Sequence, residues 1–287
     1  MTKLSIVTIN YNDAKGLERT LSSVWNEQTY SNFEHIVIDG GSTDGSVDVI
    51  KRYTDKLAYW VSEPDKGIYN AMNKGIDKAQ GEYLLFLNSG DWLEKESILR
   101  IFSKNFSEDI VYGNFTLVCK NGEKKLKTFS KQIDYKLLYL DSLGHQSTLI
   151  RRELFDSELY REDFKIISDW VFFIDHIILG KCSTRYIDVN ISFFNDEGIS
   201  SNPKYRDMVF EERSKYTEEL LESKLFPVSI LNNIINYITN ENYRYKGYLS
   251  YIADNDIDRF SSPWVLHHTR KCVRTLLKLK KLLGVRR

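Results

Sequence analysis

Aspartates stand where short apolar runs end in this chain. Asp39 follows the run 33–38 and precedes Gly40-Gly41-Ser42, while Asp91 follows the run 83–87 and the polar residues Asn88-Ser89-Gly90. Farther along, Asp169 opens an apolar stretch. Carboxylates at such places accept hydrogen bonds from hydroxyl groups, hold a hard divalent cation, or take a proton from a substrate. The same residue types form plain turns and helix caps, so the surrounding elements must decide.

The first hundred residues alternate strand and helix patterns. Apolar runs predict strands at 4–9, 33–38, 57–61 and 83–87, and helical spacing predicts helices at 13–27, around 47–53, at 67–79 and at 93–102. This alternation predicts an α/β fold with a largely parallel sheet and helices on both faces. Because an open α/β sheet places its chemistry at the carboxyl ends of its strands, we expect Asp39 and Asp91 at that edge.

The pattern changes after residue 105. Segments 109–112 and 115–119, with a turn at Asn121-Gly122, predict an antiparallel hairpin added to the sheet. Helices are expected around 135–140 and 169–179, and a strand near 183–187. From 206 the chain reads as helical and amphipathic. We therefore expect a domain over 1–205, with halves 1–105 and 106–205, followed by a helical extension over 206–287.

The composition is that of a globular protein without a global charge. Of 287 residues, 42% are apolar, and 40 Lys and Arg balance 40 Asp and Glu, which argues against nucleic acid as a partner. Three widely spaced cysteines fit a reducing compartment. The N-terminus lacks the pattern of a signal peptide, and no stretch approaches about 18 apolar residues. A cytoplasmic protein is expected.

Three segments, in this order, resemble the family 2 glycosyltransferases with the GT-A fold: 7–12 (VTINYN), 38–46 (IDGGSTDGS) and 88–91 (NSGD). The segment 62–75 (SEPDKGIYNAMNKG) also resembles that family's nucleotide site. The resemblance covers about residues 3–200. It implies a Rossmann-like, mixed but mainly parallel sheet. It also implies inverting transfer of a hexosyl or N-acetylhexosaminyl group from a nucleotide sugar, with UDP favoured over GDP and dTDP, to a hydroxyl of a glycan or lipid-linked saccharide in bacterial surface-polysaccharide synthesis.

The resemblance assigns the donor-binding residues and a metal ligand. Asp91 is expected to hold Mn²⁺ or Mg²⁺, while Ser89 replaces the first Asp of the family's Asp-x-Asp pattern. Alternatives remain for these positions: Asp91 as a helix N-cap, Asp39 as a turn residue, and the strand end around Thr8 as structural. The donor-binding residues expected are Thr8, Asn10, Tyr11, Asp39, Asp65, Lys66, Asn73 and Ser89.

For the acceptor half, the resemblance makes Asp169 the base that removes the proton of the incoming hydroxyl. Ser168 departs from the acidic pair with which this family opens the helix, but one carboxylate is enough for the task. Asp169 as a helix cap is the alternative. His145 is expected either to line the acceptor site, to approach the metal, or to be structural. Trp170 is expected either to stack on a sugar or to belong to the core.

The C-terminal residues 264–287 are basic and amphipathic, with no acidic residue. A helix there would place basic residues on one face and apolar residues on another, which suits an anionic lipid surface. We therefore expect a peripheral location on the inner face of a bacterial cell membrane. A helix packed on the protein is the alternative.

The sequence also bears on two other functional classes. A nicotinamide-dependent dehydrogenase would need Gly-x-Gly-x-x-Gly after the first strand, where the chain has Asn10-Tyr11-Asn12 instead. A catalytically silent nucleotide-sugar-binding partner subunit stays open because Ser89 replaces an acidic residue. Binding of UDP without turnover would favour that second class.

Overall fold

The structure is a computed structural model that describes residues 3–133, 137–138, 142–196, 198 and 203–222. Its contacts divide the chain into two units, residues 1–207 and 208–287, and each is considered by itself. Within the described residues, no helix combines the length and the apolar character needed to cross a membrane. The predicted tail over 264–287 lies outside the described residues.

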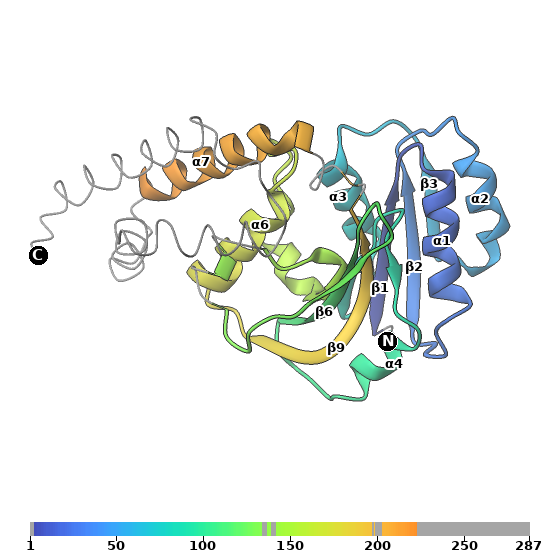
Figure 1. Cartoon of the computed structure of the whole chain (residues 1–287), viewed down its shortest axis with the longest axis horizontal. Helices are drawn as coiled ribbons and strands as arrows, with labels where there is room; N and C mark the ends of the chain where they lie inside the picture. Colours follow the sequence, from blue (N-terminus) through green and yellow to red (C-terminus); the bar gives the residue numbers. More distant parts are fainter. Residues whose placement is uncertain (1–2, 134–136, 139–141, 197, 199–202, 223–287) are drawn as a thin grey trace, which may run out of the picture. The chain divides into compact units, whose positions relative to one another are not determined.

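A parallel sheet built from strand-helix units forms the first half of the chain (Figure 1). Its four strands lie in the order β3 (Tyr59–Ser62), β2 (Phe33–Asp39), β1 (Leu4–Asn10), β4 (Tyr83–Phe86), and each adjacent pair is parallel. The chain returns from the edge strand β3 to β4, which lies beside β1, so the strand order reverses between β1 and β4. Ligands bind at such a reversal in open α/β sheets.

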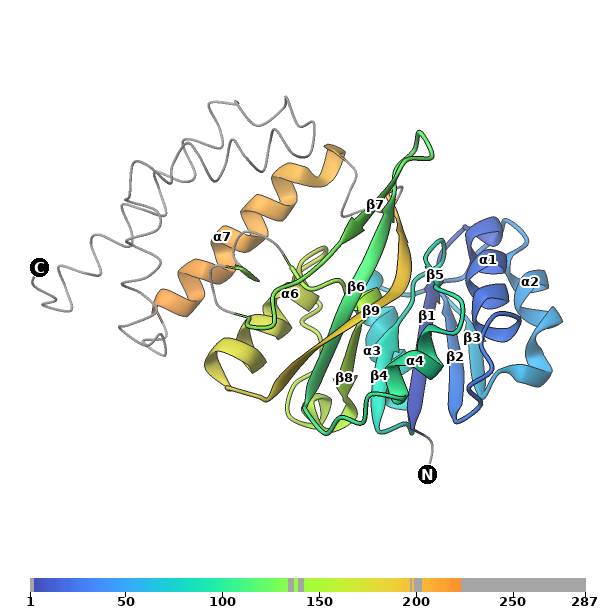
Figure 2. The same ribbon diagram turned by 60° about the horizontal axis from the view of Figure 1, so that its bottom comes forward.

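The sheet continues into the second half as β8, β6, β9 and β5, giving nine strands with β7 paired to β6. The expected antiparallel strands are present, because β8 runs antiparallel to β4 and β6, and β7 runs antiparallel to β6. The expectation differs in one respect, since β6 lies inside the sheet and also runs parallel to β9 (Figure 2). The two expected segments form one continuous strand, and its pairing with β9 has an irregular register near residue 113. The hairpin at Asn121-Gly122 is confirmed, and Gly122 has a φ of 83°. These strands are β5 (Trp92–Leu93), β6 (Ile110–Val118), β7 (Lys124–Lys127), β8 (Thr148–Arg151) and β9 (Thr184–Asn195).

Helices cover both faces of the parallel half. α1 (Ala14–Trp25) and α2 (Ser46–Arg52) lie on one face and α3 (Ile68–Lys78) on the other (Figure 1). Leu17 and Leu21 of α1 pack with Val37 in a buried cluster. Gly75 allows α3 to approach the sheet, since a Cβ there would lie 2.3 Å from Val7 Cγ1. The GT-A architecture expected from the sequence is confirmed.

Several element bounds differ from the expectations. The helix predicted over 93–102 begins only at α4 (Ser97–Phe102), because β5 pairs with β9 instead. The strand expected near 183–187 continues to Asn195. α6 (Ser168–Phe173) continues into a π-helical segment, η4 (Ile174–Leu179). Of the expected helical extension, the structure describes α7 (Arg206–Glu222). Of the helix expected around 135–140, only 137–138 are described, and both are helical.

Candidate active site

Asp39 joins the ends of three neighbouring strands. Its buried carboxylate accepts hydrogen bonds from the Asn10 amide, the Ser62 hydroxyl, and the hydroxyl and backbone N–H of Ser42, over distances of 2.6–2.9 Å. Asn10, Asp39 and Ser62 are direct register partners, so the sheet itself places them together. Burial alone would raise the pKa of Asp39, but these hydrogen bonds outweigh it and hold the pKa below its ordinary value.

Tyr11 and Asp65 lie close to Asp39, around Gly40. A Cβ on Gly40 would lie 2.5 Å from Asp65 Oδ2 and 3.2 Å from Tyr11 Cδ2, so both side chains pack closely against this backbone. The Tyr11 side chain is 66% exposed, and Lys66, next to Asp65, is also exposed. The structure therefore brings most of the expected donor-binding residues to one edge of the sheet.

Two expected donor-binding residues have other partners. Thr8 is fully buried, and its hydroxyl lies 2.9 Å from Nε2 of His35 in the core. The Asn73 amide donates to the backbone carbonyl of Tyr160 at 2.8 Å and accepts from its N–H at 3.0 Å. The structure thus does not bring Thr8 and Asn73 to the edge around Asp39.

The turn 88–91 is held from two sides. The backbone N–H of Ser89 donates to the carbonyl of Ile9 at 3.0 Å. The Thr20 hydroxyl of α1 donates to the Asp91 carbonyl at 2.6 Å and accepts from the Gly90 N–H at 3.1 Å. Gly90 has a φ of 92°, the left-handed region that favours glycine. Because β5 follows the turn directly, the helix-cap alternative for Asp91 is wrong.

Asp91 is a buried carboxylate with an unusually high pKa. One of its oxygens accepts from the backbone N–H of Asn195 at 2.9 Å, and only 4% of the residue is exposed. Burial raises the pKa from 3.8 to about 7, against the effect of that hydrogen bond and of His145, while the nearby Asp13 adds to the rise. A carboxylate in this state gains most from a cation that neutralises it.

The donor set at Asp91 fits a small hard cation of the Mg²⁺ or Mn²⁺ class. Such ions are commonly held by one or two carboxylates together with substrate phosphates and waters, and Asp91 keeps a second oxygen beyond the one bonded to Asn195. Among the described residues, no group of three or more His, Cys, Asp or Glu side chains is arranged to hold a metal. Phosphate oxygens of a ligand would therefore have to complete the coordination.

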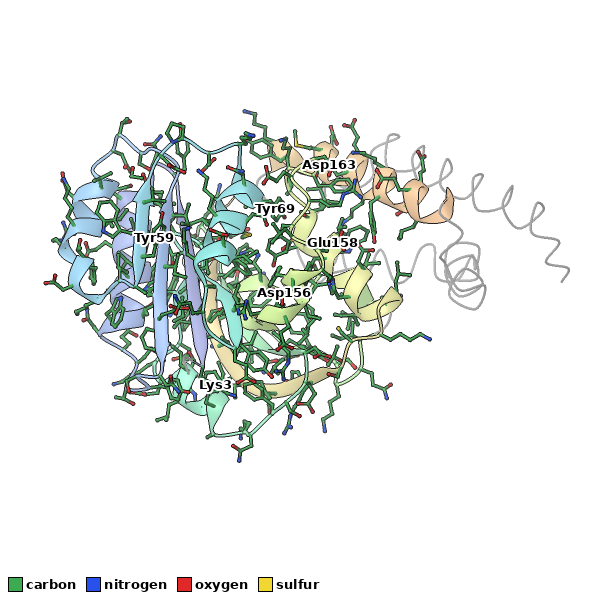
Figure 3. All side chains as sticks on the ribbon, turned by 180° about the vertical axis from the view of Figure 1, so that it is seen from behind. Lys3, Tyr59, Tyr69, Asp156, Glu158 and Asp163 are labelled. Atoms are coloured by element: carbon green, nitrogen blue, oxygen red, sulfur yellow. The ribbon has the colours of Figure 1, made fainter. Side chains whose placement is uncertain are left out.

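Asp169 lies in the first turn of α6 and is held by three donors. Its Oδ1 accepts from the Tyr69 hydroxyl and from the Trp170 N–H, both at 2.9 Å, and its Oδ2 lies 3.2 Å from Nδ1 of His145. Burial would raise its pKa, but the bonds to His145, Tyr69 and Trp170 lower it below the ordinary value. Since Ile167 is the N-cap, the cap alternative for Asp169 is wrong. Figure 3 shows Tyr69 on α3, beside the segment that leads into α6.

His145 joins the two carboxylate regions. Its Nδ1 faces Asp169, and its Nε2 lies 3.1 Å from Nδ2 of Asn88 in the turn before Asp91. Burial disfavours the charged ring, but the hydrogen bond and charge of Asp169, together with the charge of Asp91, raise the pKa of His145 above 6.5. The structure therefore brings together the turn and the expected base, although they are far apart in sequence.

Trp170 belongs to the core. It is 1% exposed, and its indole N–H donates to the backbone carbonyl of Leu138 at 2.5 Å. Of the two alternatives for this residue, the structure favours the core position over sugar stacking.

Three residues of the site were not singled out from the sequence: Thr20, Tyr69 and Asn195. Thr20 had a local signal in the sequence, because it is a polar residue on the apolar face of α1. The structure buries it fully there. Tyr69 and Asn195 had no such signal, since their partners lie 100 and 104 residues away.

Comparisons with known proteins agree with this arrangement. A glycosyltransferase for PGL/p-HBAD biosynthesis from Mycobacterium bovis is 31% identical over 69% of this chain and 78% of its own length. An uncharacterized glycosyltransferase of Haemophilus influenzae is 29% identical over 88% of this chain and 98% of its own. Among solved structures, TarS 1–349 of S. aureus in complex with UDP-GlcNAc has a TM-score of 0.71 at 18% identity, covering 98% of this chain and 83% of that one.

A more distant structure has the same fold. The mannosyltransferase PcManGT of Pyrobaculum calidifontis, in complex with GDP-Man and Mn²⁺, has a TM-score of 0.57 at 14% identity, covering 99% of this chain and 88% of that one. The family model described as Glycosyl transferase family 2 matches residues 5–175, which is more than half of the chain. With the strand order, the turn ending in Asp91 and Asp169 across from it, this match shows that the chain belongs to glycosyl transferase family 2.

Proposed function

We propose that this protein transfers a hexosyl or N-acetylhexosaminyl group, with inversion, from a UDP-sugar to a hydroxyl of a glycan or lipid-linked saccharide in bacterial surface-polysaccharide synthesis. One observation carries the proposal. His145 brings two carboxylate regions together, because its Nε2 lies 3.1 Å from Nδ2 of Asn88 in the turn that ends at Asp91 and its Nδ1 lies 3.2 Å from Oδ2 of Asp169. Burial raises the pKa of Asp91, whereas hydrogen bonds lower that of Asp169. These two carboxylates suit two different tasks. Asp91 can bind a cation that neutralises it, and Asp169 can stay ionised and accept a proton.

The donor side is formed by the strand ends around Asp39. A nucleoside offers hydroxyl and N–H donors, and Asp39 with its partners Asn10 and Ser42 forms an anionic, hydrogen-bonding edge for them. Tyr11 is exposed beside this edge and is available to pack on a base. Asp65 and Lys66 precede α3, so an ammonium and backbone N–H groups face the position proposed for the diphosphate. UDP is the carrier bound to the structurally similar TarS.

Asp91 would hold the divalent cation, Mn²⁺ or Mg²⁺, with phosphate oxygens of the donor as its other ligands. When bound, the ion would neutralise the negative charge that develops on the departing diphosphate. Ser89 stands where a second carboxylate would be expected, so a single protein carboxylate serves this site. Manganese is present in the complex of the similar PcManGT.

Asp169 acts as the base in this proposal. Among the described residues its Oδ2 contacts His145 at 3.2 Å, and the other lone pair of this carboxylate oxygen can accept the proton of the acceptor hydroxyl. The acceptor oxygen then forms the new bond to the anomeric carbon, while the bond from that carbon to the phosphate oxygen breaks. The nucleoside diphosphate leaves with the electron pair, and the configuration inverts because the step is a single in-line displacement.

We also propose a peripheral membrane location on the cytoplasmic face, through the basic residues 264–287. The basic, amphipathic pattern of this segment, without an acidic residue, and the proposed lipid-linked acceptors favour it. The choice of acceptor and of linkage depends on loops and partners, and not on the carboxylate pair.

Calorimetry and a donor panel test the proposal. Wild-type protein is titrated with UDP in the presence and absence of Mn²⁺, and nucleotide sugars are then screened for metal-dependent release of the nucleotide. We expect Mn²⁺-dependent binding of UDP and turnover of one UDP-sugar. No binding of UDP would contradict the UDP assignment, whereas binding without turnover on any acceptor would favour the silent partner subunit.

A further inference from the structure

His145 is the residue through which the donor turn and the base contact one another. It opens the short helical segment η2 (His145–Ser147), which leads into β8. Because β8 is antiparallel to β4, the start of β8 meets the end of β4, where Asn88 begins the turn. Asp169 approaches from the opposite side of the ring, on α6. The His145 side chain is only 16% exposed between these partners.

Two protonation patterns of the ring satisfy both contacts. With the proton on Nδ1, the ring donates to Oδ2 of Asp169 and accepts at Nε2 from the amide N–H of Asn88. In the second pattern the ring is charged and also donates from Nε2, to Oδ1 of Asn88 with its amide turned over, and the contact to Asp169 is unchanged. Both ring nitrogens are then engaged by protein groups. This occupancy argues against His145 as a metal ligand or as a proton acceptor for substrate.

We propose that His145 is a positioning residue that fixes the base Asp169 relative to the donor turn Asn88–Asp91. The proposal rests on the function proposed above, in which the turn holds the diphosphate side and Asp169 receives the acceptor proton. The acceptor oxygen must approach the anomeric carbon in line with the departing phosphate, and a misplacement of about 1 Å costs up to about a hundredfold in rate. A buried ring bonded to both sides sets that separation before the substrates arrive.

Two substitutions separate the effects of the two His145 contacts. The amide of an Asn side chain reaches about as far as Nδ1 of His, and that of Gln about as far as Nε2. His145→Asn therefore keeps a group toward Asp169 and loses Asn88, while His145→Gln keeps a group toward Asn88 and loses Asp169. If both contacts are needed, we expect both variants to lose about tenfold to a hundredfold in kcat. The Kd for UDP with Mn²⁺ should stay within about twofold of the wild-type value.

His176→Gln is the matched control. His176 is a partly buried histidine on the segment that follows α6, and its Nδ1 lies 3.0 Å from the backbone carbonyl of Phe172. We expect this variant to release UDP from UDP-GlcNAc, the probe donor, at the wild-type rate. A His145→Asn variant with the same wild-type rate would overturn the role of the Asn88 contact.

A double-substitution cycle tests the link itself. Asn88→Ala and His145→Asn remove the same contact, so the double variant should lose no more kcat than the more damaging single one. The same cycle is measured on the melting temperature, which needs no substrate. Independent, additive losses in both measurements would overturn the proposal. If the wild type fails to bind UDP while the melting temperatures still show coupling, the proposed function fails and the link through His145 is upheld.

Discussion

Asn73 holds the backbone of Tyr160 from both sides. Its amide donates to the Tyr160 carbonyl at 2.8 Å, and its carbonyl accepts from the Tyr160 N–H at 3.0 Å, across 87 residues of sequence. Tyr160 begins the stretch that leads to α6 and Asp169. The helix α3, which the sequence associates with the nucleotide, therefore also holds the acceptor half in place.

Asn73→Ala should destabilise the protein and slow transfer without weakening donor binding. The substitution leaves both backbone groups of Tyr160 without their partner, a loss of about 1–3 kcal/mol in the free energy of unfolding. Urea denaturation and calorimetry with UDP measure the two effects. Asn70→Ala is the control for stability, because loss of the exposed bonds of Asn70, to the Glu162 carboxylate and from the Lys66 N–H, should cost less than about 1 kcal/mol. A tenfold loss of UDP affinity at unchanged stability would return Asn73 to the donor site.

Asp91→Asn should stabilise the protein at neutral pH while removing metal dependence. Asp91 has a pKa of about 7 in the folded state and 3.8 as its reference, so the folded state keeps a proton that the unfolded state has lost between these values. Stability therefore falls as the pH rises from about 4 to 7 and is level above 7, with an upper limit of about 4 kcal/mol for the loss. The Asn side chain still offers an oxygen to the Asn195 N–H.

Unfolding free energies at several pH values between 4 and 8, without metal, check this prediction. The variant should lack the pH-dependent loss that the wild type has. Mn²⁺ should stabilise only the wild type, and increasingly so toward pH 7, because the ion must displace a proton at lower pH. Asp77→Asn, at a carboxylate whose side chain is 71% exposed, should leave the pH dependence unchanged. Equal slopes for wild type and Asp91→Asn would show that Asp91 ionises normally.

The sequence predicts the edge of the sheet well because the signals there are local. Asp39 and Asp91 each follow an apolar run directly, and such a run ends where its strand ends, so their common edge follows from the alternation of strands and helices. Gly90 and Gly122 likewise stand where the backbone needs a positive φ. These positions depend on neighbours within a few residues.

The side chains whose surroundings the sequence left open or placed elsewhere have partners that are distant in sequence. Thr8 reads as a strand-end residue, yet β1 continues to Asn10 and Thr8 turns into the core toward His35. Trp170 and Asn73 reach backbone groups 32 and 87 residues away. No local pattern states which buried carbonyl a side chain will meet, so these roles require the tertiary structure.

Tyr69→Phe should lower the rate by about fivefold to tenfold and move the acid limb of the pH profile upward. The Tyr69 hydroxyl donates to Asp169 Oδ1 and to the carbonyl of Ile166, at 2.9 and 2.6 Å. Its removal takes away one of the bonds that lower the pKa of Asp169. A base with a higher pKa becomes protonated at a higher pH, so activity should be lost earlier on acidification.

Tyr160→Phe is the control for this hydroxyl. The Tyr160 ring lies 5.5 Å from that of Tyr69, but its buried hydroxyl has no hydrogen-bond partner in the part of the chain that the structure describes. Its removal should leave the pH profile unchanged and should not lower stability, since an unsatisfied buried hydroxyl is costly. A rate loss equal to that of Tyr69→Phe would indicate that the Tyr160 hydroxyl contacts the acceptor.

Deletion of residues 264–287 should release the protein from anionic vesicles. The segment is basic and without acidic residues, and each Lys or Arg near such a surface contributes about 1 kcal/mol. Sedimentation with vesicles that contain phosphatidylglycerol measures the binding, and neutral phosphatidylcholine vesicles are the control. Unchanged sedimentation of the shortened chain would support a helix packed on the protein.

Asp169→Asn should abolish transfer and leave donor affinity intact. An Asn amide is nearly isosteric and can still accept from Tyr69, but it cannot take the proton of the acceptor, so the rate should fall by about 10²–10⁴-fold. The Kd for UDP with Mn²⁺ should stay within about twofold, because the donor edge lies at the ends of β1, β2 and β3, around Asp39, whereas Asp169 lies on α6. Measurement of both quantities on the same preparation separates loss of the base from loss of the fold. Transfer at a near-normal rate would assign the proton to another group. A parallel loss of UDP binding would instead place Asp169 on the donor side of the site.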